Sequence, residues 1–534
     1  MNSDLLGLLR SKGVLVEKEI YDVLDAIKDF NIVDKLVDNL VSVSGQKMIT
    51  KSALTKNILV AQKIFSDVSS GVKPTLIQVF VKLGLQVVVT ESPINVVVKE
   101  DIPKTRQDYK VYYAKTTFDK KITVQDFTGH FRARYREIQG MLLQRSGMEK
   151  LISINKISGT RQQFMIIGMV NSKRYTKNKN LMVTFEDLTG QITVLFKAQS
   201  EFFKSAEELQ FDEVVAVKCS GNLELVMGHE VIFPEAFILQ KTKFDEDCGL
   251  AFISDIHVGS HKFLRREFDR FIDWLDGDNE FARKIKYIFL IGDSLDGVGV
   301  FPGQERLLEI KTLKGQYDEL AKFLRRVPER ITIFMCPGQH DASRVPEPQP
   351  IVDRSYAGAL YDIPNLILVS NPCLVKLIEK DKEFKVQMYH GASIHSFINN
   401  IEELRLIKAH KHPARAVKHM LKRRHLAPSH GVSASVVYVP NAERDPLVIS
   451  ETPDILCIGE VHRLDIERHN GVLILTGNCW QAQTEFEEKI GNIPDPCKVP
   501  VFNVKTHELK IFDFNLSEDE KTLQDSENKV EVRV

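Results

Sequence analysis

An Asp-x-His pair, Asp255 and His257, closely follows the short apolar run of residues 250–253. In an extended or turning backbone, side chains two positions apart point the same way, so a carboxylate oxygen and an imidazole nitrogen can reach one cation. The run predicts a buried strand, and open α/β sheets place their ligands just beyond the carboxyl ends of such strands. By itself the pair is a weak signal, because Asp-x-His also occurs by chance in surface turns.

Four more apolar runs downstream also end in glycine and ligand-type residues. They lead into Gly-Asp-x-x-Asp-Gly, Gly-Gln-His-Asp, His-Gly and Gly-x-x-His. The polar residues at these places are Asp293 and Asp296, Gln339, His340 and Asp341, His390, and Glu460 and His462. Five such motifs in this order would rarely occur by chance in a fold that does not use them to bind a ligand.

Carboxylates and imidazoles together provide the ligands for two divalent cations, which in such sites lie about 3.5–4 Å apart and share a bridging carboxylate. Because several imidazoles stand among the carboxylates, Mn, Fe or Zn is favoured over Mg alone. A site of this kind activates water and stabilises the leaving oxygen of a phosphate ester. His340, beside a candidate ligand at Gln339, is then a candidate general acid. The alternative is that these residues are satisfied polar groups in five separate loops.

Apolar residues recur at helical spacing near residues 263–275 and 317–327, between the expected strands. Strands that alternate with amphipathic helices are typical of an α/β fold. We therefore expect a multidomain α/β protein in which one unit, residues 244–515, positions all five motifs.

Residues 151–243 carry five strand-length apolar runs separated by turns, with a helix-like insert at residues 201–209 before the fourth run. This pattern predicts a small Greek-key barrel of the oligonucleotide-binding (OB) type. Lys173, Arg174 and Lys177, between the first two runs, would suit contacts with the phosphates of DNA. The alternative is that the barrel is a protein-interaction face and its basic loop a solvated turn.

The two ends of the chain predict less chemistry. Residues 1–70 show helical spacing and suggest a small docking or assembly domain. Residues 71–150 are expected to form a linker with local structure, including a helix over 126–145. Residues 516–534 are expected to be an acidic, disordered tail.

A basic run at residues 408–425 lies between the fourth and fifth motifs and ends in Lys422, Arg423 and Arg424. These side chains are candidates for contacts with DNA phosphates. A solvated helix face is the alternative.

Length and composition set further bounds. A chain of 534 residues is too long for one core and should hold three or four units. The apolar fraction of 43% and charged fraction of 27% are those of a globular protein. Since the formal net charge is zero, any affinity for nucleic acid must come from local patches.

The seven cysteines are scattered, without a Cys-x-x-Cys pair, which argues against a zinc ribbon and against a disulfide framework. No apolar run approaches the roughly 18–20 residues that span a bilayer. The start of the chain also has no basic flank before an apolar core. We therefore expect a cytoplasmic protein with no membrane partner.

The five motifs, in this order, resemble those of the calcineurin-like metallophosphoesterases. Over residues 1–515 the chain is similar to the small subunits of archaeal family D DNA polymerases. The Lys-Arg-Arg-His-Leu-Ala-Pro run at 422–428 and the Trp-Gln-x-Gln-Thr stretch at 480–484 are more specific for this resemblance than the metal motifs.

The resemblance implies a phosphoesterase β-sandwich flanked by helices and a 3′-5′ proofreading exonuclease that acts in DNA replication. It implies a large polymerising subunit and the 3′ end of a DNA primer as partners, with a sliding clamp as a further candidate. It also implies two divalent ions, with Mn expected and Fe, Zn or Mg as alternatives. The implied ligands are Asp255, His257, Asp293 and His462 for the first ion, and Asp293, Gln339, His390 and Glu460 for the second, with Asp293 bridging and His340 as the acid.

This chain departs from the family pattern, which reads Gly-Asn-His-Asp and Gly-His-x-His, at Gln339 and Glu460. Both departures fall on the second metal. A rival hypothesis is therefore an assembly subunit with weakened or lost catalysis. A third hypothesis, a small-molecule or protein phosphatase, suits the metal motifs but not the barrel before them.

Overall fold

A computed structural model describes residues 3–17, 21, 33–34, 37, 48–49, 108–114, 121–431 and 436–515. The chain forms two units, Met1–Lys104 and Thr105–Val534. The described parts of the first unit include α1 (Ser3–Ser11) and the parallel two-residue strands β1 (Leu15–Val16) and β2 (Met48–Ile49). Most of the helical domain expected over residues 1–70 and the acidic tail expected over 516–534 lie outside the described residues.

Alternating apolar residues build a closed five-stranded barrel in the order β4-β5-β6-β8-β7. In β5 every second residue, Leu181, Val183 and Phe185, is fully buried in the barrel interior. The short helix α8 (Phe203–Glu207) lies between β6 and β7 in the chain. The expected five-stranded barrel is therefore confirmed. Its strands are β4 (Gln162–Tyr175), β5 (Leu181–Glu186), β6 (Gln191–Phe196), β7 (Val214–Gly221) and β8 (Val226–Ile232).

Strand β4 is buried on both faces because a helix covers its outer face. Helix α7 (Val124–Leu143) starts at a capping box between Thr123 and Asp126. Its Ile138 and Leu142 pack with Met165 of β4 in one buried cluster. This explains why β4 reads as a continuous apolar run rather than an alternating one.

Two six-stranded sheets carry the motifs, in the orders β12-β11-β10-β9-β18-β19 and β16-β17-β15-β14-β13-β3. Apolar residues from both sheets, such as Phe252, Phe289, Val386 and Cys457, share one buried cluster, so the sheets pack face to face. The strands are β3 (Tyr109–Tyr113), β9 (Gly249–Ile253), β10 (Ile285–Ile291), β11 (Thr332–Cys336), β12 (Leu366–Leu368), β13 (Cys373–Glu379), β14 (Lys382–Tyr389), β15 (Ile455–Ile458), β16 (Asp465–His469), β17 (Val472–Thr476), β18 (Lys498–Asn503) and β19 (Leu509–Asp513).

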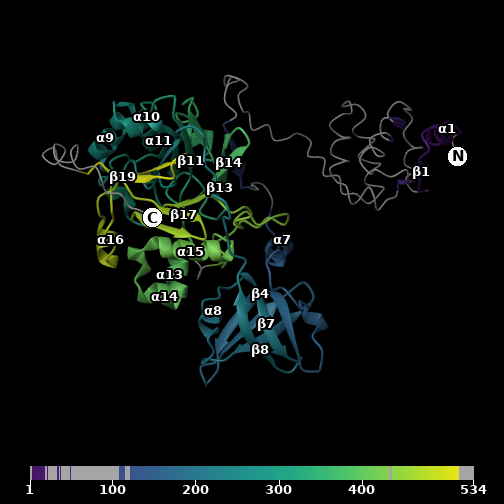
Figure 1. Cartoon of the computed structure of the whole chain (residues 1–534). Helices are drawn as coiled ribbons and strands as arrows, with labels where there is room; N and C mark the ends of the chain where they lie inside the picture. The colour runs from purple at the N-terminus through teal and green to yellow at the C-terminus, as the bar shows by residue number, and fades with distance from the viewer. Residues whose placement is uncertain are drawn as a thin grey trace. The chain divides into compact units, whose positions relative to one another are not determined.

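Helices cover the outer faces of both sheets (Figure 1). Helices α9 and α11 share a core with the first sheet, and α13 and α15 share one with the second. The two helices expected near 263–275 and 317–327 are confirmed as α9 and α11. The helices of this unit after the barrel are α9 (Arg265–Asp276), α10 (Glu280–Lys284), α11 (Leu313–Leu324), α12 (Arg354–Ala357), α13 (Ile394–Asn400), α14 (Glu402–Leu406), α15 (Pro413–Arg423) and α16 (Glu485–Ile490). Short 3-10 turns lie before the barrel, at η1 (Ile154–Lys156), and after it, at η2 (Gln304–Arg306) and η3 (Ala409–Lys411).

The structure differs from the linker expected over residues 71–150. Strand β3 pairs antiparallel with β13 and forms an edge of the second sheet, with Val111 opposite Val375. The expected helix over 126–145 is confirmed as α7. Residues 71–107 and 115–120 lie outside the described residues.

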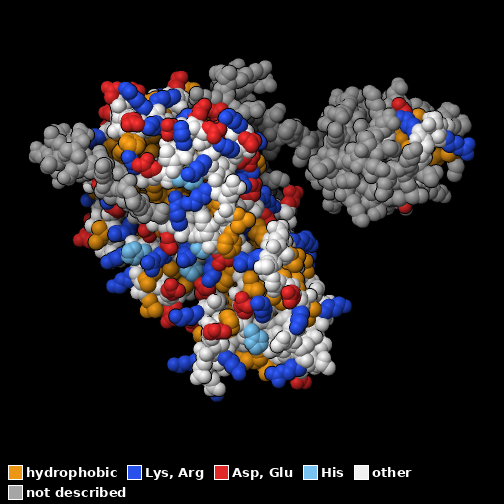
Figure 2. Space-filling view, viewed as in Figure 1, with side chains coloured by type: hydrophobic (Ala, Val, Ile, Leu, Met, Phe, Trp, Pro, Cys, Tyr) orange, Lys and Arg blue, Asp and Glu red, His pale blue; other side chains and the backbone are white. Residues whose placement is uncertain are grey.

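Two further expectations from composition can be compared with the structure. All seven cysteines are free and buried, in agreement with the expectation that they form no disulfide framework. Within the described segments, no helix combines the length and the apolar character needed to cross a membrane. Figure 2 shows basic and acidic side chains interspersed over the visible face, as expected for a net charge of zero.

Candidate metal centre

The candidate ligands follow strand ends and converge at one place. Asp255 and His257 follow β9, Asp293 follows β10, His390 follows β14 and His462 follows β15. Strands β9 and β10 are parallel, as are β14 and β15, so their carboxyl ends lie at common sheet edges. Three groups have ligand atoms within 4.8 Å of one another, and they share members: Asp255, His257 and His462; His257, Asp296 and His340; and Asp255, Asp293 and His390.

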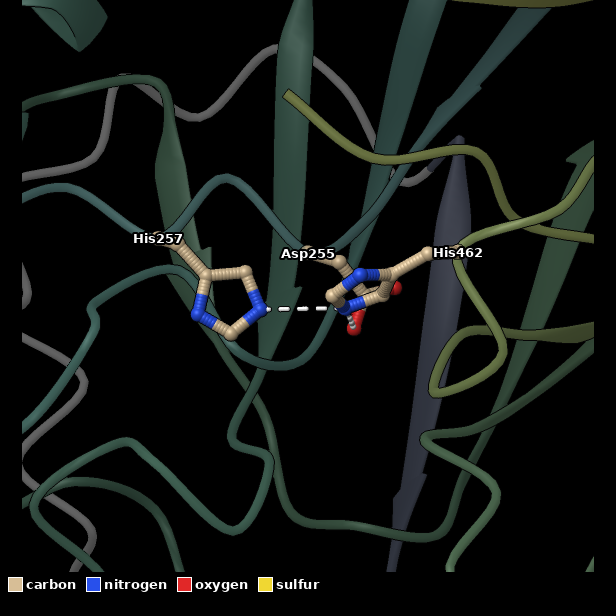
Figure 3. A group of neighbouring side chains, drawn as sticks. All are labelled: Asp255, His257 and His462. Carbon is tan, nitrogen blue, oxygen red and sulfur yellow. Dashed lines mark hydrogen bonds and ion pairs between the residues drawn. The ribbon is translucent and has the colours of Figure 1, made fainter. Parts of the chain in front are cut away.

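The first group brings together side chains from loops far apart in the sequence. The Nε2 atoms of His257 and His462 are 3.1 Å apart, and Nε2 of His462 lies 3.5 Å from Oδ1 of Asp255 (Figure 3). Two imidazole nitrogens that face each other beside a carboxylate can share a proton or a metal ion. The structure thus places three of the four residues that the resemblance assigns to the first ion in direct contact.

The group that contains Asp293 centres on His390, whose Nε2 lies 3.3 Å from Oδ2 of Asp293 and 3.2 Å from Oε2 of Glu460. The other oxygen of Glu460 lies 3.4 Å from Nε2 of His395. Gln339 borders the same cleft, and its Oε1 atom is buried without a hydrogen-bond partner among the described residues. Both residues that depart from the family pattern therefore belong to this centre.

The backbone at the ligands is held in an uncommon conformation. Asp255, His257, Asp293, Glu460 and His462 all have positive φ angles, between 46° and 73°. Side chains other than glycine rarely adopt this left-handed region, and each such residue costs on the order of 1–3 kcal/mol. Five strained residues in one cluster indicate a site that the surrounding fold holds in place.

Two motif glycines make room for ligand carboxylates. A Cβ atom on Gly338 would overlap Oδ1 of Asp293, and one on Gly459 would lie 2.7 Å from Oδ2 of Asp255. Any larger residue at either position would displace a ligand. The glycines in Gly-Gln-His-Asp and Gly-x-x-His are therefore explained by close packing.

Charges at the centre are strongly coupled. Burial opposes the charge of Asp293, but His390, His340 and His257 outweigh it and hold the pKa of Asp293 well below its usual range. Burial also opposes the charge of His390, whose pKa is nevertheless raised by Asp293. Burial, reinforced by Asp293, raises the pKa of Asp341 to about 7. Asp341 accepts hydrogen bonds from backbone amides and so supports the loop rather than offering a ligand.

The donor set fits divalent cations. Nδ1 of His257 and Nε2 of His390 are buried and, among the described residues, have no hydrogen-bond partner of good geometry, although each lies near a carboxylate. Buried imidazole nitrogens without hydrogen-bond partners are costly unless a cation or proton occupies the space they face. Mixed nitrogen and oxygen donors favour Mn, Fe or Zn over Mg.

His340 lies at the edge of the centre and is partly exposed. Its Nδ1 atom is 2.7 Å from the carbonyl oxygen of Asp296, and its Nε2 atom is 3.9 Å from Oδ2 of Asp293. If Nδ1 donates to that carbonyl, Nε2 is the nitrogen that can exchange a proton with a molecule in the cleft. This orientation agrees with the general-acid role expected for His340.

Four residues of the site have no role predicted from the sequence. Asp296 belongs to the Gly-Asp-x-x-Asp-Gly motif, and its Oδ1 lies 3.2 Å from Nδ1 of His257. Glu487 contacts His462, and its signal was the Thr-x-x-Glu capping box at the start of α16. Asp341 follows His340 directly in a motif, whereas His395 carried no sequence signal.

The Trp-Gln-x-Gln-Thr stretch makes hydrogen bonds to residues of the metal centre. The backbone amide of Trp480 donates to the carbonyl oxygen of Asp255, and the indole packs against Phe268. Gln481 donates from Nε2 to Oδ1 of Asp296 at 3.1 Å. This stretch therefore fixes residues of the centre rather than adding a ligand.

The expectation that Lys422, Arg423 and Arg424 contact DNA phosphates is corrected by the contacts that these side chains make within the protein. The Arg423 side chain is fully buried, with Nε 2.5 Å from Oε2 of Glu213 at the base of the barrel. Arg424 donates to backbone carbonyl oxygens, and Lys422 pairs with Glu208. Lys422 and Arg423, at the end of the basic run, instead join α15 to the barrel.

The barrel residues proposed for DNA contacts divide into two kinds. Nζ of Lys173 donates to the carbonyl oxygens of Glu207 and Leu209, so this lysine is engaged within the barrel. Arg174 and Lys177 are exposed. Of the three predicted residues, Arg174 and Lys177 therefore remain available to a ligand of the barrel.

Similarity to known sequences identifies the class of the protein. The family of DNA polymerase alpha/epsilon B subunits matches residues 250–467, which include every candidate ligand. The chain is 34% identical over 388 residues to the DNA polymerase II small subunit of Methanothermobacter thermautotrophicus, covering 71% of this chain and 78% of that protein. It is 33% identical over 421 residues to the one of Thermoplasma acidophilum, covering 77% and 82%. The chain therefore belongs to the family of archaeal DNA polymerase II small subunits.

Some relatives are longer than the matched part. The match to the DNA polymerase II small subunit of Pyrococcus furiosus, at 34% identity, covers 74% of this chain but 64% of that protein. A solved structure described as a novel archaeal phosphodiesterase aligns at 13% identity over 49% of this chain and 98% of that chain, with a TM-score of 0.24. That score is too low to support an inference about the fold.

Proposed function

We propose that this chain is the small subunit of a two-subunit replicative DNA polymerase in the cytoplasm and carries a metal-dependent 3′-5′ exonuclease. Its motif-bearing unit is then a calcineurin-like phosphoesterase, and its barrel an OB-fold. The observation that carries this proposal is the convergence of Asp255, His257, Asp293, His390 and His462 at the strand ends of one cleft. On this proposal its partners are the large polymerising subunit and the primer 3′ end, with a sliding clamp as a further candidate.

Asp255, His257 and His462 would hold one ion, His390, Glu460 and Gln339 a second, and Asp293 would contribute to both. Such ions supply an activated water molecule and neutralise charge on the leaving oxygen. His340 stands beside this centre with Nε2 directed toward Asp293. It would give a proton to the 3′ oxygen of the penultimate nucleotide as the phosphorus–oxygen bond breaks, which releases a nucleoside monophosphate.

The rival function is an assembly subunit whose second metal site has lost its activity. One observation favours it: both oxygens of Glu460 already lie near imidazole nitrogens, of His390 and His395. Turning this paired, anionic carboxylate toward a metal ion costs more free energy than turning the neutral imidazole that the family pattern has at this position.

Degradation of a 3′-mismatched primer by the full chain with Mn²⁺ tests the proposal. We expect release of nucleotides that Asp293→Ala abolishes and His340→Ala strongly reduces. The double variant Gln339→Asn, Glu460→His restores the family pattern and serves as the matched comparison for the second metal.

The outcomes separate the hypotheses. Activity of the wild-type chain that both alanine changes remove supports the exonuclease. A silent wild-type chain with an active double variant supports the assembly subunit. Hydrolysis of a generic phosphomonoester without any activity on DNA would instead indicate a phosphatase.

A further inference from the structure

The candidate metal residues form the floor of a large cleft. Its volume is about 1270 Å³. Pockets for small ligands usually measure about 300–1,000 Å³, so this cleft exceeds what a single nucleotide needs. The cleft extends from Asp293 and His462 to the segment that includes α14 and η3, and to helix α16.

One wall of the cleft presents lysines that have no partner. Lys408 and Lys411 are exposed, and their ammonium groups make no hydrogen bond or ion pair with any residue that the structure describes. Three of the acidic residues that line the cleft, Asp293, Asp296 and Glu460, lie at its floor, where cations would neutralise them. The other two, Glu485 and Glu487, lie on α16, away from the lysine wall. Positive charge along a wall that leads to a metal centre suits a chain of phosphates.

Arg463 connects this wall to the metal centre. It follows His462 directly, and its Nε donates to the carbonyl oxygen of Lys411 at 3.1 Å. Its Nη1 atom donates to the carbonyl oxygen of Ile493, in the loop after α16, also at 3.1 Å. Arg463 is therefore a positioning residue that holds the lysine wall and the α16 loop at a fixed separation.

Exposed aromatic rings border the same cleft. Phe486 on α16 is 69% exposed, and Phe301, in the loop between β10 and η2, is 43% exposed. Phe486 precedes Glu487, whose carboxylate contacts His462, and both residues line the cleft. An exposed phenylalanine is unfavourable in water, but it provides a face on which an unpaired base can stack.

We propose that single-stranded DNA enters the metal centre along this cleft, with its phosphates on Lys408 and Lys411 and its terminal base stacked on Phe486. The inference rests on the proposed function for the identity of the substrate. Duplex ends are disfavoured, because pairing and stacking hold the terminal base in the duplex and prevent it from turning toward an aromatic side chain in the cleft. This geometry would select a frayed or mismatched 3′ end over a correctly paired one.

The test of the lysine wall is the affinity of the full chain for a labelled oligothymidine in the presence of EDTA, which prevents hydrolysis. Each phosphate contact contributes about 0.7 to the slope of log affinity against log salt concentration for single strands. The double variant Lys408→Gln, Lys411→Gln should therefore lower the magnitude of this slope by about 1.4. The matched control is Arg415→Gln, Lys418→Gln, on α15 outside the cleft.

The test of the aromatic contact is Phe486→Ala, which should weaken binding of the single strand by about tenfold and leave binding of a blunt duplex unchanged. The control is Tyr356→Ala, a ring that is 48% exposed and lies outside the cleft. A photoreactive 3′-terminal thymidine should crosslink to peptides containing residues 405–411 or 484–493.

These measurements are independent of turnover, so failure of this inference is distinguishable from failure of the proposed function. If the wild-type chain hydrolyses DNA but the lysine double variant keeps its salt slope and Phe486→Ala keeps its affinity, the proposed DNA path is wrong and the exonuclease proposal is unaffected. Crosslinks confined to the barrel, residues 162–232, would also overturn it. Altered binding without any hydrolysis would support the path and count against the exonuclease.

Discussion

Nδ1 of His462 lies 3.0 Å from Oε1 of Glu487, and the same carboxylate closes the capping box of helix α16. Its second oxygen accepts hydrogen bonds from the backbone amide and hydroxyl of Thr484. The helix start therefore fixes the carboxylate, and the carboxylate fixes the imidazole so that Nε2 faces Asp255 and His257. Carboxylates that orient a histidine in this way commonly tune the metal site.

The first prediction concerns this carboxylate. Glu487→Gln keeps the capping geometry but removes the charge beside His462, so we expect metal affinity to fall by about 10- to 100-fold with little change in stability. Calorimetric titration of the metal-free chain with Mn²⁺ measures this change. Glu488→Gln, on the exposed side of α16, is the matched control. Equal affinities of both variants and the wild type would show that Glu487 serves the helix alone.

A second prediction concerns the space that Gly338 leaves for Asp293. A methyl group on Gly338 would collide with the Asp293 carboxylate and its backbone nitrogen, so Gly338→Ala should reduce metal binding and hydrolysis by at least about 100-fold. The control is Gly140→Ala in helix α7, where a Cβ meets no atom within 4 Å. That change should raise stability by about 0.5–1 kcal/mol. Full activity of the Gly338→Ala variant would contradict the placement of Asp293 at the centre.

The sequence predicted the strands that carry the motifs because these strands are buried on both faces. Strand β9, for example, is fully buried at all five positions, so its apolar residues form an unbroken run that stands out. Edge strand β3 has exposed Tyr112 and Tyr113 and follows residues of linker-like composition. Its partner β13 is far away in the sequence, and nothing local predicts that pairing.

Site residues that belong to a metal-ligand motif could be predicted from the sequence. Residues whose role depends on packing in the fold could not. Asp255 and His462 could be selected because their residue types and order are those of metal ligands. The role of His395 depends on contact with Glu460, which only the fold creates. The prediction for Arg423 was wrong because a basic sequence looks the same whether its side chains bind phosphates or a buried carboxylate. Only the burial of Arg423 in the fold distinguishes these two roles.

A third prediction tests that correction. The guanidinium of Arg423 and the carboxylate of Glu213 are both buried where α15 meets the barrel. Arg423→Ala leaves Glu213 without its cation and should cost about 3–5 kcal/mol of unfolding free energy. The double change Arg423→Met, Glu213→Met removes both charges and should cost much less. Chemical denaturation of the three chains measures the difference, and equal losses for single and double variants would contradict a coupled pair.

The last prediction is a pH dependence at the same contact between the barrel and α15. Burial opposes the charge of Glu208, but His419, Arg423 and Lys422 outweigh it and lower its pKa to about 2, from an ordinary value of 4.5. Because the folded pKa lies below the unfolded one, the ionised carboxylate stabilises the fold fully above about pH 4.5, and this contribution is lost as the pH falls toward 2. Glu208→Gln should therefore destabilise the chain by about 1–3 kcal/mol near neutral pH, with a penalty that shrinks as the solution is acidified.

Denaturant titrations from about pH 7 to about pH 3 measure this penalty as the difference in unfolding free energy between the wild-type and variant chains. Glu201→Gln, an exposed change just before helix α8, is the control and should change the unfolding free energy only slightly. A penalty for Glu208→Gln that stayed constant over the whole range would mean that the carboxylate packs at this contact without being held there by its charge. A penalty that grew on acidification would require a folded pKa above 4.5, which the surrounding cations oppose.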